Sequence, residues 1–282
     1  MAMVINTNVA SLNSQRQLTR TNQSLQTSME RLSSGLRVNS AKDDAAGLSI
    51  ADKMTSQIRG MTVAMRNAND GISMAQTAES AMGAITETLQ RMRDLGVQAA
   101  NRGAVSDSDR EKLQTEFKQL GDEIGRIIGN TEFNGKKILA GSLVGAIFQV
   151  GAGTSANNQI SITVSNLSNV SGIGVIQAGT VSIGSVATSA NVLSAIDSID
   201  VAIGKIDDFR ANLGAVQNRF TTTIGNLQSS IENQSAARSR IMDADFAVET
   251  SNLSRSQILQ QAGTAMLSQA NQSAQSVLSL LQ

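Results

Sequence analysis

The chain has 282 residues, with 23 basic and 23 acidic side chains, and therefore no formal net charge. It contains no Cys, His, Trp, Tyr or Pro and only six Phe. This composition excludes disulfides and the usual ligands of zinc, copper and haem, and it argues against aromatic platforms for single-stranded nucleic acid. We therefore expect no cofactor, no metal and no nucleic-acid partner, and a neutral surface that does little to oppose self-association.

The N-terminal segment, residues 1–17, has no basic region followed by an apolar run, so it lacks the pattern of a secretory signal peptide. No stretch approaches the roughly 18 consecutive apolar residues of a membrane-spanning helix. We expect no membrane insertion, and if the protein leaves the cell, we expect another export route.

Apolar residues in the first quarter of the chain recur with the spacing of a coiled coil. Steps of seven, four, three and four residues separate Leu18, Leu25, Met29, Leu32 and Leu36. This spacing predicts a helix, and Gly35 near its end suits a helix stop.

A second, longer helix is predicted to extend to about residue 100. One apolar row recurs every seven residues from Met61 to Gly96, and a companion row does so from Ala78 to Ala99. With no Pro to interrupt it, a helix of roughly 60 residues is about 90 Å long. Ala, Gly and Met in its seam would let neighbouring helices approach closely.

A third helix follows a polar break, with Ser106 or Asp107 as its expected cap. Apolar residues at steps of three and four run through residues 113–127. The Asn134-Gly135 pair then predicts a tight hairpin turn.

The composition changes over residues 140–190, which carry no charge and are rich in Gly, Ser, Val and Ile. Residues 146–150 and 159–164 read as two strands joined by a Gly/Asn-rich loop, which predicts a β-hairpin. Residues 165–190 hold either further short strands or loop.

Helix resumes near Asn191, with an apolar row every seven residues from Ile199 to Leu227. The last helix has apolar residues at steps of three and four. These residues are Leu259, Ala262, Met266, Ala270, Ala274, Val277 and Leu281.

The organisation is symmetric about the middle of the chain, and the simplest fold pairs the two ends. We therefore predict a mainly α fold, a long antiparallel helical coiled-coil rod of paired N- and C-terminal segments, with a small β-hairpin region at about 140–190. The terminal segments are amphipathic and poor in charge, which favours other copies of the chain as their cover. An ordinary monomeric bundle would fit the helices but not the neutral surface.

Lys42, Asp43 and Asp44 raise a separate question, because a cation beside two carboxylates suits either acid/base chemistry or a helix joint. Ser40 and Asp43 have the capping-box spacing, and acidic residues in a first turn favour the helix dipole. A catalytic pair would need a pocket, which a few paired helices hardly offer. We favour a cap and joint, and expect no enzyme activity.

Long motifs at both ends of the chain resemble bacterial flagellins. The N-terminal ones are "VINTNVASLNSQRQL", "MERLSSGLRVNSAKDDAAGLSIA", "RNANDGISMAQTAE" and "LQRMRDLGVQAAN". The C-terminal ones are "LGAVQNRF", "ARSRIMDADFAVETSNLSRSQILQQAGTAMLSQANQ" and "VLSLLQ". The match covers roughly residues 1–140 and 190–282, which leaves only about 50 residues between the halves and implies a short form without a large outer domain.

The resemblance implies a subunit that self-polymerises into the flagellar filament for swimming. Residues 1–40 and 241–282 would form an inner-tube coiled-coil domain, and residues 41–240 an outer-tube domain. The implied partners are the cap and hook–filament junction proteins, and an export chaperone at the C-terminal segment. The protein would leave the cell unfolded through the flagellar type III apparatus and reside in the extracellular flagellum. The alternative is a flagellar junction or adaptor protein, or a secreted helical binding module.

The resemblance also assigns roles to single residues. Gln90, Arg91, Leu95 and Glu116 correspond to the contact motif for the vertebrate innate receptor that recognises flagellins. The inner-tube helices would pack through Leu25, Met29, Leu32, Leu259, Met266, Ala270, Val277 and Leu281. Gly35, Ser40, Lys42, Asp43 and Asp44 would form the joint between the domains.

Overall fold

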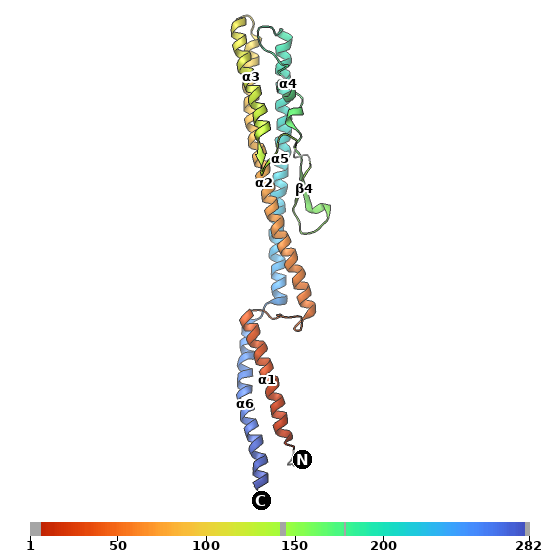
Figure 1. Cartoon of the computed structure of the whole chain (residues 1–282), viewed down its shortest axis with the longest axis vertical. Coiled ribbons are helices and arrows are strands. Elements are labelled where there is room, and N and C mark those ends of the chain that lie inside the picture. The colour runs from red at the N-terminus through yellow and green to blue at the C-terminus, as the bar shows by residue number, and fades with distance from the viewer. Residues whose placement is uncertain (1–6, 142–144, 178, 280–282) are drawn as a thin grey trace. The chain divides into compact units, whose positions relative to one another are not determined.

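A computed structural model describes residues 7–141, 145–177 and 179–279, and the side chains of the last helix up to Ser273. The chain is mainly helical, as predicted (Figure 1). Its long helices are α1 (Val9–Ser34), α2 (Ala45–Ala100), α3 (Asp107–Asn130), α5 (Ser189–Met242) and α6 (Phe246–Ser279). No helix within the described residues is long and apolar enough to cross a membrane. The chain divides into two compact units, unit 1 (Met1–Gln57 and Glu232–Gln282) and unit 2 (Ile58–Ile231).

Unit 1 is built on α1 and α6, which lie side by side and antiparallel (Figure 1). Asn8 caps the start of α1 through the backbone N–H of Ser11. Gly35 ends the helix in the left-handed conformation, with φ 71°, and its N–H donates to the Arg31 carbonyl. The predicted helix stop is therefore confirmed, and it depends on a backbone conformation that glycine adopts without a Cβ penalty.

The two connections of unit 1 pair with each other through their backbones. Leu36 and Asp243 form an antiparallel bridge, and the Ala244 N–H donates to the Gly35 carbonyl at 2.9 Å. The Arg37 N–H donates to the Met242 carbonyl at 2.6 Å. The exit from α1 and the entry to α6 are thus fixed to each other.

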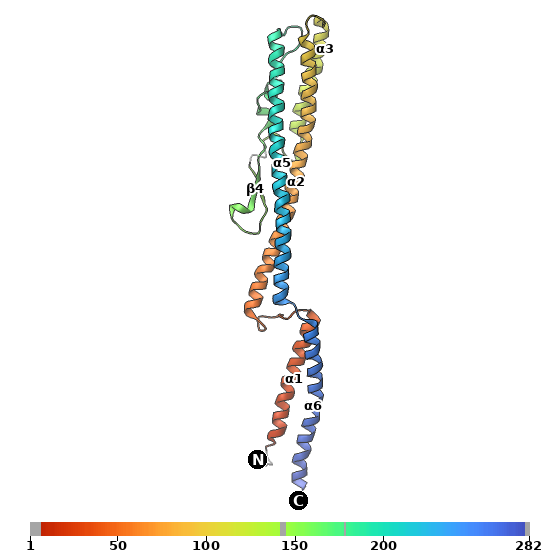
Figure 2. The same cartoon turned by 180° about the vertical axis from the view of Figure 1, so that it is seen from behind.

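Unit 2 packs most of α2 against the antiparallel α5, with α3 beside them (Figure 2). Every residue of both predicted α2 rows, from Met61 to Gly96 and from Ala78 to Ala99, is buried. The predicted α5 row from Ile199 to Leu227 is buried as well. The seven-residue spacing therefore identified the inward faces of both helices correctly.

The β structure consists of two small hairpins. Strands β1 (Glu132–Phe133) and β2 (Lys136–Lys137) flank the predicted turn, where Asn134 and Gly135 have φ of 50° and 73°. Both positive values are what a type I′ turn requires.

The second hairpin pairs β3 (Ala146–Gln149) with β4 (Gln159–Ile162), as predicted. It lies against the long helices, because Asn67 of α2 donates to the Gln149 carbonyl and Phe148 meets Phe220 of α5 edge to face. A short 3₁₀ turn, η1 (Ala156–Asn158), lies between the two strands.

The question left open for residues 165–190 is answered in favour of loop and short helices. Beyond the hairpin lie only η2 (Leu167–Asn169) and α4 (Ile173–Gln177), with no strand in the described part of this range. Its apolar side chains Leu167, Ile173 and Ile183 are fully buried in the unit 2 core.

Candidate functional site

The buried positions in the seam between α1 and α6 are polar. Ser11, Ser28, Glu249 and Ser256 are each 8% exposed or less, whereas no large aliphatic side chain described on these two helices is buried. The seam therefore cannot hold the two helices together by apolar burial in the way that a globular core does.

Polar contacts cross this seam along its length. Arg31 Nη1 lies 3.1 Å from Glu249 Oε1, and the Glu249 side chain is only 7% exposed. The other contacts are Gln260 Nε2 to Asn22 Oδ1 at 3.0 Å, Ser11 Oγ to Asn271 Oδ1 at 2.9 Å, and Asn8 Nδ2 to the Ala270 carbonyl at 2.9 Å.

Large apolar side chains of the same helices point to solvent instead. We call them the terminal apolar set, and each member is at least half exposed. Its members are Val9, Leu12, Met29, Phe246, Val248, Ile258, Leu259 and Met266. Exposed apolar surface of this extent marks an interaction surface in a soluble protein.

This arrangement changes the role expected for the predicted packing residues. Leu25, Leu32 and Ala270 are half-buried. Met29, Leu259 and Met266 are 55%, 52% and 63% exposed, so the described part of the chain leaves them largely uncovered. The position of Leu281 and the side chain of Val277 lie outside the described residues.

The joint before α2 differs from the predicted capping box. The helix begins at Ala45, and Asp44 caps it, since its Oδ1 accepts the Gly47 N–H at 2.8 Å. The prediction that Ser40 is the cap and that Asp43 and Asp44 lie in the first turn is wrong. A Cβ on Gly47 would collide with the Asp44 carboxylate as it is placed, so a side chain at this position would require the carboxylate to shift.

Ser40 and Asp43 form a separate turn just ahead of the helix. The Asp43 Oδ2 accepts the Ser40 N–H at 2.9 Å, the Ser40 hydroxyl at 3.0 Å and the Asn39 N–H at 3.2 Å. The Ser40 backbone N–H, then the Ser40 hydroxyl, lower the pKa of Asp43 below its ordinary value of 3.8. Lys42 is exposed and pairs with neither carboxylate in the described structure.

Three of the four predicted receptor-contact residues lie together on unit 2. Arg91 of α2 donates to Glu116 of α3 through Nε at 2.9 Å and Nη2 at 2.6 Å, with side chains 56% and 42% exposed. Gln90 is exposed beside them. Leu95 is 1% exposed. It belongs to the core and not to this surface, because its side chain is turned inward among the helices.

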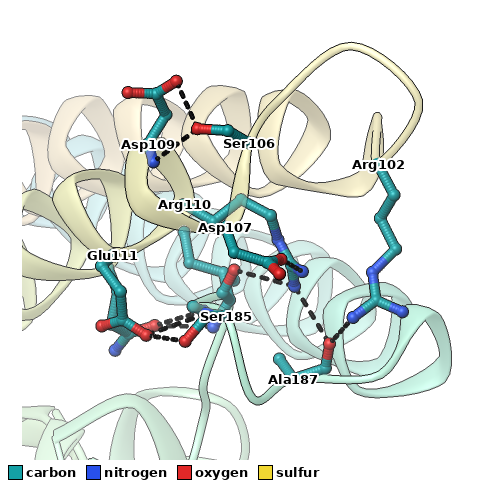
Figure 3. A network of polar contacts seen from close by, with 11 residues as sticks. Arg102, Ser106, Asp107, Asp109, Arg110, Glu111, Ser185 and Ala187 are labelled. Carbon is teal, nitrogen blue, oxygen red and sulfur yellow. Dashed lines mark hydrogen bonds and ion pairs between the residues drawn. The ribbon is translucent and has the colours of Figure 1, made fainter.

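A second polar cluster of unit 2, at the start of α3, was not anticipated from the sequence. Ser106 is its N-cap, as expected, through the Asp109 N–H. Arg110 is 1% exposed, and Figure 3 shows its guanidinium group and that of Arg102 both directed at the Ala187 carbonyl. Two positive groups thus hold one backbone oxygen of the segment that leads into α5.

The same segment is held by two further side chains of α3. Glu111 accepts the hydroxyl and the backbone N–H of Ser185, and these hydrogen bonds lower the pKa of Glu111 (Figure 3). Gln114 Oε1 accepts the backbone N–H groups of Ile183 and Gly184 at 2.6 and 3.1 Å. Side chains of α3, together with Arg102, therefore supply polar partners to the uncharged segment.

Comparison with protein families identifies the family of this helical chain. The bacterial flagellin N-terminal helical region matches residues 5–143, and the bacterial flagellin C-terminal helical region matches residues 196–281. The chain is a bacterial flagellin. Only residues 144–195 lie between the two matched regions, which agrees with a short form of this family.

Individual relatives agree along the whole length. The flagellin of Bacillus subtilis (strain 168) is 44% identical over 99% of this chain and 100% of its own. The flagellin of Xenorhabdus nematophila is also 44% identical, over 100% of both chains. A putative flagellar hook-associated protein from Vibrio parahaemolyticus, solved as a structure, shares 14% identity with a TM-score of 0.58, covering 71% of this chain and 100% of its own, and shows the fold alone. This flagellin is a structural subunit of the bacterial flagellar filament.

Proposed function

We propose that this flagellin polymerises by covering its terminal apolar set with the terminal helices of neighbouring copies. In this proposal residues 1–40 and 241–282 act as the inner-tube domain, and residues 41–240 as the outer-tube domain. The observation that carries it is the reversal in unit 1, where the seam buries Ser and Glu while Ile258, Met266 and their companions face solvent.

The energy available from such a contact is large. Full burial of an Ile, Leu or Met side chain contributes about 1.5–3 kcal/mol. The terminal apolar set has eight members, each at least half exposed, and a filament repeats the contact in every copy. The zero net charge of the chain adds no repulsion between copies.

Substitution of one member tests the proposal. Ile258 is 66% exposed on α6, so Ile258→Gln leaves the isolated chain as stable as before but removes buried area from the polymer. We expect the critical concentration for polymerisation to rise by about tenfold, since roughly 1.4 kcal/mol corresponds to a factor of ten. Sedimentation of seeded polymer gives the measurement.

The matched control is Val186→Gln, which removes a more exposed apolar side chain, 86%, from a loop of unit 2. It should leave the critical concentration within about twofold of the wild type. If both variants polymerise equally well, the terminal helices are not the assembly surface.

We propose the remaining partners by resemblance to the family. An export chaperone would bind the C-terminal segment around residues 269–282, and cap and hook–filament junction proteins would contact the assembled ends. Export would use the flagellar type III apparatus without a cleaved signal peptide, and the polymer would lie outside the cell. The exposed Gln90, Arg91 and Glu116 would be the surface available to the host innate receptor.

A further inference from the structure

The apolar contacts of the α1–α6 seam follow one simple rule. On α1, Leu18, Leu25 and Leu32 recur every seven residues and are half-buried. A Cβ built on Gly263 of α6 would lie 3.2 Å from Leu18 Cδ1, so this leucine faces the glycine. With antiparallel helices, the same offset places Leu25 opposite Ser256 and Leu32 opposite Glu249, so two of the three leucines meet small residues.

This rule does not define a single register. If α6 slides by one heptad, Leu18 comes opposite Ala270, Leu25 opposite Gly263 and Leu32 opposite Ser256. Every leucine then meets a small residue, Leu32 included, and a step of seven residues returns each side chain to the same face. Apolar packing therefore discriminates weakly between the observed pairing and one displaced by about 10 Å, the rise of seven helical residues.

The polar contacts are not degenerate in this way, and the backbone pairing of residues 35–37 with 242–244 opposes the same slip. A slip of one heptad separates Arg31 from Glu249, whose carboxylate is buried. Among the described residues, Glu249 Oε2 and Arg31 Nε have no other hydrogen-bond partner, so neither group has a second contact to fall back on. A buried charge that loses its partner is strongly destabilising, even where the intact pair contributes little net stability.

A second polar contact excludes the same slip. Gln260 Nε2 donates to Asn22 Oδ1 at 3.0 Å, nine residues from Arg31 along α1. Sliding α6 by a heptad moves Gln260 away from Asn22 and leaves both amides to find other partners. On α1, Asn22 and Arg31 lie on either side of Leu25, and both contacts oppose the same displacement.

We infer that Arg31 and Glu249, with Asn22 and Gln260, are positioning residues that set the register of α1 on α6. Single polar contacts in coiled-coil seams commonly have this role. The register decides how Leu12 and Met29 on α1 align with Ile258 and Met266 on α6. The inference therefore rests on the proposed assembly through the terminal apolar set, for which this alignment is the template.

A distance measurement across the helix pair tests the inference on the full chain. Gln15 on α1 and Ser251 on α6 are exposed, and the chain has no cysteine, so Gln15→Cys with Ser251→Cys carries nitroxide labels at these two sites alone. The sites are offset along the helix axis. A slip in either direction therefore changes the electron–electron distance by several ångström, up to about 10 Å.

The decisive variant replaces the polar contacts by apolar ones, Arg31→Met with Glu249→Leu and Asn22→Leu with Gln260→Leu. We expect the share of displaced pairs to rise at least about tenfold, because the slip no longer strands a charge. The charge exchange Arg31→Glu with Glu249→Arg keeps an ion pair across the seam and should give the single label-to-label distance of the parent. The control Leu25→Ala weakens the seam but keeps its polar contacts, and should also keep one distance.

Two results would overturn the inference. One is a single unchanged distance in the apolar variant, which would show that the backbone pairing of residues 35–37 with 242–244 sets the register without the polar side chains. The other is several distances in the labelled parent. The measurement is made on the free chain and on polymer diluted with unlabelled chains. Failure of the proposed assembly would show separately, as parent protein that does not sediment, whatever the distance in the free chain.

Discussion

The two units of this flagellin use the same helical repeat for opposite purposes. In unit 2, the seven-residue rows bury Met82, Ile85 and Leu89 completely. In unit 1, the rows that face the partner helix hold Ser256, Glu249 and half-buried leucines, and the larger apolar groups lie outside. Periodicity therefore identifies the faces of a helix, but it does not tell which face meets the chain's own partner helix.

The difference has an energetic meaning. Unit 2 buries a large apolar core within one chain, as a self-sufficient domain does. Unit 1 leaves its terminal apolar set exposed and depends on polar contacts that individually contribute about 0.5–1.5 kcal/mol. One unit is complete as a single copy, and the other has the properties of one part of a larger assembly.

The largest expected effect is the loss of a core aromatic ring in unit 2. Phe220 is fully buried, meets Phe148 edge to face, and lies so close to Gly71 that no Cβ would fit there. Phe220→Ala should reduce the free energy of unfolding by about 3–5 kcal/mol. Urea unfolding followed by circular dichroism measures it.

The matched change in unit 1 is Leu25→Ala, at a half-buried seam position. Its cost to the free chain should be about 1 kcal/mol, since much of the side chain is already in contact with water. Equal losses in the two variants would mean that unit 1 has a core comparable to that of unit 2, and the contrast between them would fail.

A smaller effect is expected where α2 begins inside unit 1. Asp44→Ala removes the acceptor of the Gly47 N–H and should cost about 1 kcal/mol of local helix stability. Asp44→Asn keeps an acceptor and is the control. Amide hydrogen exchange at Gly47 and Leu48 gives the measurement, and unchanged exchange in the alanine variant would show that the cap is not what orders this turn.

The fold was largely predictable, because strong seven-residue rows and turn chemistry act locally. The α2 and α5 rows, the Gly35 stop and the Asn134-Gly135 turn depend on nearby residues and appeared as predicted. The start of α2 did not, because Ser40 and Asp43 satisfy the capping-box spacing within a separate turn. Asp44 is itself a favoured N-cap residue type, directly before the helix that starts at Ala45, and was the signal that could have identified the true cap.

The candidate site was less predictable, because it depends on which of two faces each terminal helix turns inward. Met29 and Met266 have heptad spacing and yet are exposed, because Ser28 and Gly263 allow the helices to meet more closely at the small-residue face. The buried Arg110 gave no signal in the sequence, since its partner is the backbone oxygen of Ala187, 77 residues away. Only the tertiary structure brings these groups together.

The smallest expected effect concerns pH. In both units, a serine hydroxyl donates a hydrogen bond to an aspartate three residues later. Ser40 lowers the pKa of Asp43 in unit 1, and the Ser106 hydroxyl, the largest cause, lowers that of Asp109 in unit 2. A carboxyl whose pKa is lower in the folded than in the unfolded chain stabilises the fold above the unfolded pKa. That stabilisation is lost as pH falls through the folded pKa. For Asp43 the loss therefore lies below its ordinary 3.8.

Carbon-13 NMR titration of the two carboxyl groups tests whether each serine acts on its own unit. Ser40→Ala removes the hydroxyl donor and should raise the pKa of Asp43 while leaving that of Asp109 unchanged. Ser106→Ala should do the reverse. If Ser40→Ala left the pKa of Asp43 unchanged, the turn ahead of α2 would be held by its backbone alone. The side-chain polar contacts that stabilise unit 1 would then be those of the α1–α6 seam and the Asp44 cap.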